Sequence, residues 1–221
     1  MLIVGAKGFA KEVLEVVWQN NQNEEIVFFD NITAEIEDLL FGQFRILKSI
    51  PEAIEYFALN SDKRFTIGIG NPISRFNLHK MFLEIGGAFV STISPYVRIG
   101  HFDNIIEAGC NIMGGTIITN SVKIGKGALI NLNCTVGHDC TIGEFVEMSP
   151  GTHISGNCRI GSFSVLGTNS TILPKLTLGD NVIVGAGAVV TKDVPANSLV
   201  VGIPAKIVKD LPKIDLLLKL F

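Results

Sequence analysis

Aliphatic side chains recur at every sixth residue through the second half of the chain. The series has fifteen positions, all aliphatic or methionine: Ile106, Ile112, Ile118, Ile124, Ile130, Val136, Ile142, Met148, Ile154, Ile160, Leu166, Ile172, Leu178, Val184 and Val190. A shorter series of Ile93, Ile99 and Ile105 precedes it, displaced by one residue. Neither a helix, with a period of about 3.6, nor a plain strand, with alternating sides, has this period. The pattern therefore predicts a repeated six-residue unit.

Such units predict short strands that turn a corner after every unit. Three of them close a triangle of about 18 residues, and successive coils pair as parallel strands about 4.8 Å apart. The aliphatic residue then points into the prism, and the glycine that often follows it helps the chain to turn. The pattern resembles the hexapeptide repeat of the left-handed parallel β-helix, and this resemblance alone implies the left hand. Because the register is unbroken after Ile106, we expect no long loop to leave the coils there.

The cysteines fall within the same repeat. Each lies four residues after an aliphatic position, in a slot held in most other repeats by Thr, Val, Ala or Ser. A free cysteine behaves as a small hydrophobic side chain, and the sequence has no CxxC motif for metal or redox chemistry. We therefore expect Cys110, Cys134, Cys140 and Cys158 to be packing residues, and we predict no metal site.

The first 90 residues lack the period and alternate strand and helix signals. Strands are predicted at LIVG, IVFFD and FTIGIG, and helices from about Ala10 to Gln19, over IPEAIEYFA and over ISRFNLHKMFLEIG. This alternation predicts a small α/β domain with a Rossmann-like parallel sheet at 1–90. The β-helix is assigned to 91–210. A cap is assigned to 211–221, where a short helix near Ile214–Phe221 would protect the last coil.

The first strand-to-helix turn is a candidate phosphate site. Gly5, Lys7, Gly8 and Phe9 lie in this turn, where backbone N–H groups and the helix dipole can hold an anion. Lys7 stands where the second glycine of a dinucleotide-binding GxGxxG motif would be, so the turn does not match that motif. The same residues also fit a merely tight turn.

Residues after the next two predicted strands could meet the same ligand. Asp30 ends IVFFD, where an acidic residue would contact a ribose or base edge, although Asp30 and Asn31 also suit the start of a loop. Gly70, Asn71 and Arg75 follow FTIGIG. Arg75 could pair with a phosphate or simply face solvent.

Charge and composition narrow the classes of partner. The chain has 221 residues, of which 47% are hydrophobic, and a net charge of -3. It therefore has no basic field that would draw it to nucleic acid or to an anionic membrane. No run approaches the roughly 18 apolar residues of a membrane span, and the N-terminus lacks signal-peptide features. We expect a cytoplasmic protein.

Four segments together resemble one enzyme family. They are VGAKGFAKEV, FFD, IGIGNPISR and, after the repeats, VVTKDVPANSLVVGIPAK. Over nearly the whole chain this order is similar to the sialic acid O-acetyltransferase and nucleotide-sugar N-acetyltransferase family of bacterial surface-glycan synthesis. The resemblance implies an N-terminal domain that binds the nucleotide sugar. It also implies a β-helix that forms a homotrimer, with acetyl-CoA between subunits.

The resemblance also implies site residues. His138, within GHDCTIG and followed by Asp139, matches the catalytic base of the family. The residues expected to contact acetyl-CoA are Gly156, Ala186, Ile203, Pro204 and Lys206. The N-terminal turn and strand-end residues named above are expected to bind the nucleotide sugar.

Elementary chemistry supports the same role for His138. Histidine is the usual general base near neutral pH, and the Asp139 carboxylate could orient its ring and stabilise the imidazolium. A coil of about 18 residues places Gly156 one rung from His138, where the Gly156 N–H could stabilise an oxyanion on the thioester carbonyl. Asn120 lies one coil on the other side and is a candidate substrate contact.

One position departs from the family pattern. The family commonly has a second histidine nine residues after the first, and this chain has Glu147 there. An ionised glutamate accepts hydrogen bonds but does not donate them. Glu147 could therefore mark a different handling of acceptor or CoA, or act as an acid/base aid. We expect His79 and His101 to be structural, and His153 is a weak candidate because it is out of phase with His138.

The sequence favours acetyl-CoA-dependent acetylation of a nucleotide-linked amino sugar, such as a 4-amino-4,6-dideoxyhexose. O-acetylation of sialic acid or a related sugar is the alternative, and the motifs do not separate the two. A γ-type carbonic anhydrase needs three histidines around zinc, whereas His101, His138 and His153 are not spaced by multiples of 18. A non-catalytic β-helix scaffold is the third interpretation, under which replacing His138 changes nothing.

Overall fold

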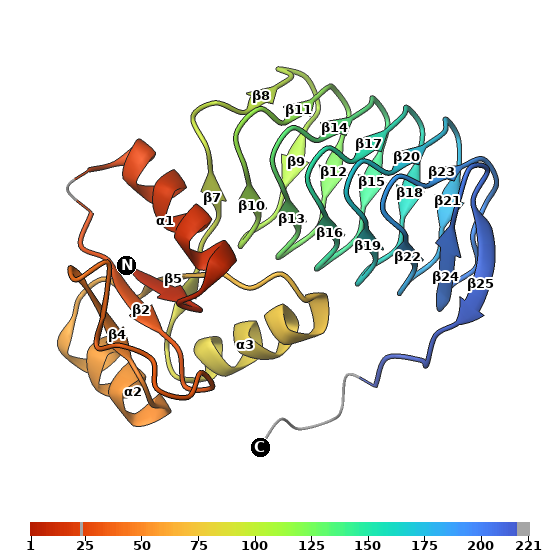
Figure 1. The fold of residues 1–221 in the computed structure, drawn as a ribbon. Coiled ribbons are helices and arrows are strands. Elements are labelled where there is room, and N and C mark those ends of the chain that lie inside the picture. The colour runs from red at the N-terminus through yellow and green to blue at the C-terminus, as the bar shows by residue number, and fades with distance from the viewer. Residues whose placement is uncertain (23, 216–221) are drawn as a thin grey trace.

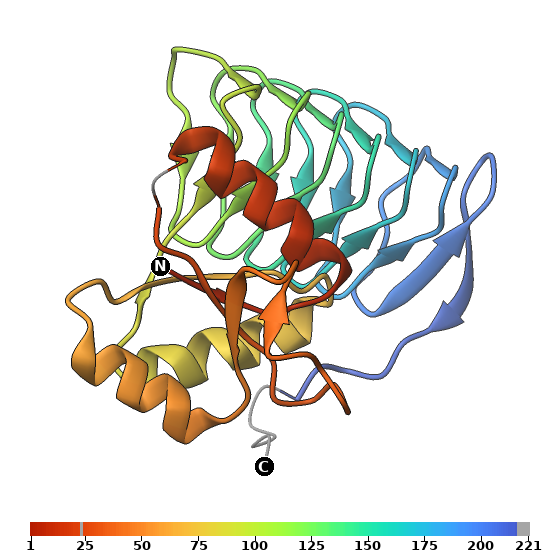
Figure 2. The ribbon, with the colours of Figure 1, turned by 60° about the vertical axis from the view of Figure 1, so that its left-hand side comes forward.

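The computed structural model describes residues 1–22 and 24–215. An N-terminal α/β domain lies beside a three-sided parallel β-helix (Figure 1). Figure 2 shows helix α1 (Gly8–Asn20) lying along the first coils, where it contacts strand β7 (Thr92–Ile93). The predicted fold, an α/β domain followed by a parallel β-helix, is confirmed. No helix of the described residues is long and apolar enough to cross a lipid bilayer.

The α/β domain is built on a sheet with strand order β3-β4-β2-β1-β5-β6. Its strands are β1 (Leu2–Val4), β2 (Val27–Phe29), β3 (Leu39–Leu40), β4 (Phe44–Leu47), β5 (Arg64–Ile67) and β6 (Ala88–Phe89). Strand β3 pairs antiparallel with β4, and the other pairs are parallel. Because β2 and β4 extend the sheet on one side of β1 and β5 on the other, the strand order reverses at β1. A crevice for ligands forms at such a point.

Side chains on successive residues of these strands point to opposite faces of the sheet. Ile3 and Phe28 pack with α1 on one face, whereas Leu2 and Phe29 pack on the other. Helices α2 (Ile50–Leu59) and α3 (Pro72–Glu84) cover this second side. Helices therefore bury both sides of the sheet, as in doubly wound α/β domains.

The described β-helix has one parallel sheet on each side of its prism. The docked face, which carries the α/β domain, contains β7, β10 (Asn111–Ile112), β13 (Leu129–Ile130), β16 (Glu147–Met148), β19 (Val165–Leu166), β22 (Ile183–Val184) and β24 (Ser198–Val201). The second face contains β8 (Arg98–Ile99), β11 (Ile117–Ile118), β14 (Thr135–Val136), β17 (His153–Ile154), β20 (Thr171–Ile172) and β23 (Val189–Val190). The third face contains β9 (Ile105–Ile106), β12 (Lys123–Ile124), β15 (Thr141–Ile142), β18 (Arg159–Ile160) and β21 (Thr177–Leu178).

The six-residue series forms the core of this prism. The second residue of each two-residue strand from β10 to β23 points inward, and Ile130, Met148 and Leu166 have no exposed surface. The cysteines lie in the same core as free thiols. The predicted packing role of the cysteines is therefore confirmed.

The upstream series needs one correction. Residues 100–104 join β8 to β9, one residue more than in the 137–140 turn between β14 and β15. The Asn104 amide stabilises this longer turn by donating to Gly100 O (2.8 Å) and Thr119 O (2.7 Å). The extra residue turns Ile105 outward, where it is 50% exposed, and brings Ile106 to the core side.

The C-terminal end of the β-helix also differs from the prediction. Strand β25 (Lys206–Asp210) folds back antiparallel on β24, so a β-hairpin covers the last coil. Residues 211–215 form no helix. Most of the predicted helix at Ile214–Phe221 lies outside the described residues.

Buried polar contacts join the α/β domain to the docked face. The Asn111 side chain is 2% exposed; its amide donates to Ile67 O (2.7 Å) and its carbonyl accepts from the Thr66 hydroxyl (3.0 Å). Farther along, the Phe76 ring of α3 packs edge-on against Phe145, with ring centroids 5.4 Å apart. The two domains therefore share an interface that contains buried, hydrogen-bonded polar groups.

Candidate active site

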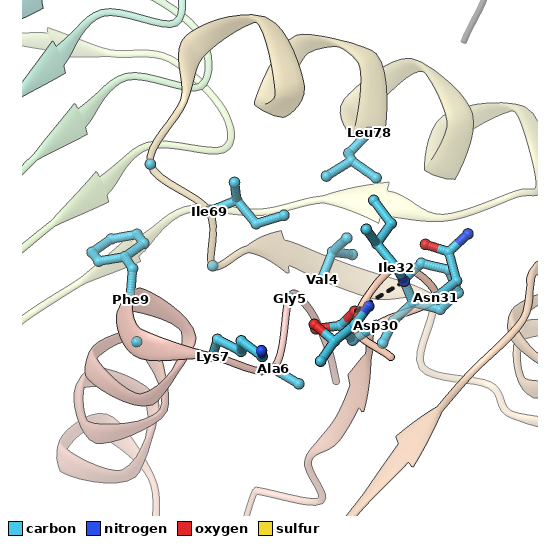
Figure 3. Close-up of a pocket in the computed structure, with 15 residues that line it drawn as sticks. Val4, Gly5, Ala6, Lys7, Phe9, Asp30, Asn31, Ile32, Ile69 and Leu78 are labelled. Atoms are coloured by element: carbon cyan, nitrogen blue, oxygen red, sulfur yellow. Dashed lines mark hydrogen bonds between the residues drawn. The ribbon is translucent and has the colours of Figure 1, made fainter. Parts of the chain in front are cut away.

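A cavity of about 330 Å³ lies at the carboxyl ends of β1, β2 and β5 (Figure 3). This is the crevice expected where the strand order reverses. The structure brings seven predicted substrate residues to its walls: Gly5, Lys7, Gly8, Phe9, Asp30, Asn31 and Gly70. Sequence reasoning missed Ile32, Thr33, Ile69 and Leu78, which also line it. Ile32, Thr33 and Ile69 could have been predicted, because they lie within two residues of Asn31 or Gly70 at the strand ends.

The Gly5 turn is shaped to admit an anion. Gly5 has a φ of 110°, and a Cβ there would lie 2.9 Å from Gly68 O, so glycine is required. Helix α1 begins at Gly8 with no side-chain cap and no acidic residue in its first turn. Its first N–H groups are therefore available to a phosphate.

Asp30 and Asn71 use their side chains to hold the backbone. The Asp30 carboxylate accepts from Thr33 N and Oγ1, both at 2.9 Å, which fits the loop interpretation although Asp30 also lines the cavity. Asn71 caps α3 by accepting from Ser74 N (3.0 Å) and is not among the lining residues.

Arg75 neither faces solvent nor reaches the cavity. Its side chain is only 2% exposed, and its guanidinium donates to backbone carbonyls at the junction of the two domains. The structure therefore does not support the expected contact with a substrate phosphate.

His138 and Asp139 lie at the corner where the second face meets the third. The Asp139 Oδ2 atom is 2.7 Å from His138 Nδ1, and both side chains are more than half exposed. This contact fixes the ring and leaves Nε2 free to take a proton.

Gly156 lies one coil away at the same corner. A Cβ on Gly156 would lie 2.6 Å from His138 Nε2 and 2.8 Å from Cε1. The coils hydrogen-bond through Asn157 N and His138 O (2.8 Å), whereas the Gly156 N–H has no acceptor among residues 1–22 and 24–215. An oxyanion bound beside His138 could therefore use this N–H.

The other polar residues of the coils have mainly structural contacts. Asn120 O accepts from Asp139 N (3.2 Å), and the Asn120 side chain accepts from Phe102 N (3.2 Å) in the coil below. His153 hydrogen-bonds Thr135 (3.0 Å) across the second face. Within the described chain no group of His, Cys, Asp or Glu side chains could hold a metal ion.

The predicted acetyl-CoA residues are divided between separate corners of one chain. Gly156 is at the His138 corner, whereas Ala186 lies in the 185–188 turn that joins β22 on the docked face to β23 on the second face. Ile203, Pro204 and Lys206 lie at the exposed turn and start of the β24–β25 hairpin, and Ile203 is 76% exposed. One subunit therefore does not gather these residues at a single corner.

The cavity at the strand ends is also separated from His138. The α/β domain covers the docked face, and the His138 corner is the vertex opposite that face. The packed side chains of Val136, Ile142 and Met148 fill the prism between them. Within one chain, the docked face and His138 therefore lie on opposite sides of a packed core.

Comparison with known proteins places this geometry in a family. Residues 1–82 match the PglD N-terminal domain and residues 157–192 match the bacterial transferase hexapeptide (six repeats). The structure is similar to WeeI from Acinetobacter baumannii AYE, with 32% identity, a TM-score of 0.86 and coverage of 94% of this chain and 98% of that one. The chain belongs to the nucleotide-sugar acetyltransferase family. It is thus an acetyl-CoA-dependent acyltransferase, as the hexapeptide repeat and GIPAK ending indicated.

Two further similarities concern proteins with named substrates. GDP-perosamine N-acetyltransferase of Escherichia coli O157:H7 is 29% identical over 201 residues, which are 89% of this acetyltransferase and 80% of that protein. PerB from Caulobacter crescentus, solved in complex with CoA and GDP-perosamine, has 28% identity, a TM-score of 0.83 and coverage of 93% and 95%. The match to the bifunctional protein GlmU of Rhizobium rhizogenes spans only 28% of that longer protein.

Proposed function

We propose that this acetyltransferase transfers the acetyl group of acetyl-CoA to the amine of a nucleotide-linked amino sugar, such as a 4-amino-4,6-dideoxyhexose. We place the reaction in bacterial glycan biosynthesis in the cytoplasm, where the free thiols of the core would stay reduced. The observation that carries the proposal is the arrangement of His138, Asp139 and Gly156 at one corner. Similarity to enzymes of GDP-perosamine supports the substrate class.

The corner can perform direct acetyl transfer. The amine nitrogen attacks the thioester carbonyl while His138 Nε2 takes a proton from the nitrogen. The carbonyl oxygen becomes an oxyanion, which the Gly156 N–H stabilises. The C–S bond then breaks, and the CoA sulfur leaves and takes the proton back from the imidazolium. Asp139 keeps the ring oriented and stabilises its positive charge.

We also propose that the active enzyme is a homotrimer with acetyl-CoA and the reacting amine between subunits. The packed prism separates the acceptor cavity from His138 within one chain, which supports a site that a second copy completes with its own His138. A closed ring of copies lets every cavity meet one such corner. The separation of Ala186 from Gly156 calls for the same arrangement, with the two contacts coming from neighbouring subunits.

Subunit mixing tests this arrangement. His138→Ala removes the base, and Gly8→Asp places a carboxylate at the proposed phosphate-binding turn of the cavity, where a Cβ has free space. Each variant alone should be inactive. When the two are unfolded and refolded together in equal amounts, random assembly pairs an intact cavity with an intact histidine at about one quarter of the sites. Activity of the mixture no greater than that of the separate variants would refute a shared site.

The substrate is tested by acetyl-CoA consumption with UDP- and GDP-linked amino sugars and with free sialic acid. We expect turnover with a nucleotide-linked amino sugar and formation of an amide. Turnover with sialic acid alone would instead establish the O-acetyltransferase alternative. Lack of turnover with every amino sugar would refute the proposal, and unchanged activity of His138→Ala would refute the assigned base.

A further inference from the structure

The buried arginine at the domain junction binds three separate pieces of backbone. Arg75 Nε donates to Gly127 O (3.2 Å), and Nη2 donates to Phe145 O (2.8 Å) and Val146 O (3.0 Å). Its Nη1 donates to Gly70 O. The first three carbonyls belong to two successive coils, and the fourth belongs to the loop that lines the acceptor cavity. Arg75 therefore links the cavity wall to the coil that carries His138 at another corner.

Because the Arg75 side chain is buried, only a guanidinium can supply all of these hydrogen bonds. Desolvation lowers the pKa of Arg75 to about 10, so the guanidinium still carries its charge at neutral pH. A planar guanidinium can donate in several fixed directions at once, whereas a lysine ammonium has no such fork. A side chain without donors would leave the carbonyls without their partner in a buried place.

Glu147 follows this carbonyl cluster directly in the chain. A Cβ on Gly70 would lie 3.4 Å from Glu147 Oε1, so the carboxylate stands next to the cavity loop, just beyond the residues that line the cavity. Burial raises the pKa of Glu147, and the positive charge of Arg75 acts in the opposite direction. Within residues 1–22 and 24–215 the Glu147 carboxylate accepts no hydrogen bond. A half-buried carboxylate without a donor is available to a ligand.

The position along the cavity indicates which part of the ligand meets Glu147. The anion-binding turn at Gly5 and Lys7 lies in the middle of the site (Figure 3). Asp30 and Asn31 lie on one side of the turn, Phe9 lies on the other, and Ile69 lies across from Lys7. Gly70 follows Ile69, so Glu147 stands at the end away from Asp30. If the phosphates bind at the turn and the nucleoside on the Asp30 side, the sugar extends toward Glu147.

We propose that Glu147 accepts hydrogen bonds from the acceptor sugar and that Arg75 is the positioning residue that holds Glu147 and the Gly70 loop in place. This assignment rests on the proposed function, because it concerns the sugar end of the same site. It involves no proton transfer. It is therefore an alternative to an acid/base role for Glu147.

Equilibrium binding separates a sugar contact from a structural role. Affinity is measured for a nucleotide diphosphate alone, GDP or UDP, and for the corresponding nucleotide amino sugar. Glu147→Gln should weaken the nucleotide sugar by about tenfold or more, the effect of losing a hydrogen bond to a charged group. Binding of the nucleotide alone should stay unchanged. Glu144→Gln, on an exposed residue at the preceding corner, is the matched control. It should change neither the affinity for the nucleotide nor that for the nucleotide sugar.

The positioning role of Arg75 is tested through its coupling to Glu147. Arg75→Lys keeps the charge but loses the fork, so it should raise KM for the nucleotide sugar and leave KM for acetyl-CoA unchanged. Adding Glu147→Gln to Arg75→Lys should weaken binding of the nucleotide sugar much less than Glu147→Gln weakens it in the wild type. Arg64→Met, at the exposed end of β5 away from the cavity, is the control arginine.

Each outcome decides the inference separately from the proposed function. Equal weakening of nucleotide and nucleotide sugar by Glu147→Gln, or weakening of neither, would overturn the sugar contact. Full additivity of the Arg75 and Glu147 changes would overturn the positioning role. These binding measurements need no catalysis, so wild-type enzyme that binds the sugar without acetylating it would refute the proposed function alone. Should Arg75→Lys fail to fold, the Glu147→Gln binding difference still decides the sugar contact.

Discussion

Replacing Gly156 by alanine should slow acetyl transfer about a hundredfold while leaving the enzyme folded. The new Cβ would lie 2.6 Å from His138 Nε2, 2.8 Å from Cε1 and 3.1 Å from Cδ2. Carbon and nitrogen atoms prefer about 3.5–4.0 Å, so the ring has to move by roughly an ångström. Gly156 is not in the left-handed region, and alanine therefore fits its backbone without strain.

The structure indicates which group will give way. The His138 side chain is 64% exposed, so it can swing into solvent, whereas the coil backbone beneath it is held by the core. The free energy of unfolding should change by less than about 1 kcal/mol. The cost falls on catalysis, because the ring leaves Asp139 and no longer points at the amine. A displacement of this size lowers kcat by about 10²-fold.

The assay is steady-state acetyl transfer together with thermal unfolding. Alanine keeps the backbone N–H, so Gly156→Ala tests the position of the base separately from the oxyanion donor. Gly114→Ala is the control, since a Cβ at that corner would lie 3.4 Å from Ser94 Oγ and 3.8 Å from Tyr96 Cβ, both ordinary contacts, and should leave activity intact. Wild-type kcat in Gly156→Ala would refute the assigned geometry, as would a loss of activity explained by an equal loss of folded protein.

Three other changes test the ion pair, the core and the pH dependence. Asp139→Asn should lower kcat by about tenfold to a hundredfold with both KM values nearly unchanged, because the imidazolium loses its counter-charge. Ile130→Ala, at a position with no exposed surface, should cost about 2–5 kcal/mol in urea unfolding, whereas Leu59→Ala at 77% exposure should cost less than about 0.5 kcal/mol. Arg64 and the N-terminal ammonium hold the pKa of Asp62 below its ordinary value of 3.8, so its stabilisation is present above pH 3.8 and lost as the pH falls below it. Asp62→Asn should therefore lower the free energy of unfolding by roughly 0.5–1 kcal/mol at pH 7, a small amount because solvent screens a partly exposed ion pair. This difference from wild type should shrink below pH 3.8, and a difference that stays constant with pH would contradict this account.

The sequence by itself determined the β-helix and the meeting of His138 with Gly156. The six-residue period records where the core is, since each inward position has to be apolar in every coil. A constant coil length then converts spacing along the chain into stacking in space. The sequence also predicted the residues at the cavity, because parallel strands of a doubly wound sheet bring their carboxyl ends to one edge. The residues around Gly5, Asp30 and Gly70 line a single cavity for this reason.

Only the tertiary structure decided the features that depend on contacts between distant segments. Arg75 follows a cavity strand and looked like a phosphate ligand, yet carbonyls of two coils more than 50 residues away draw its side chain inward. The outward turn of Ile105 depends on Asn104 bonding across coils. The proposal of a second copy at the site rests on which face of the prism carries the α/β domain. No local pattern encodes that choice, because it is made by side chains that meet only after both domains have formed.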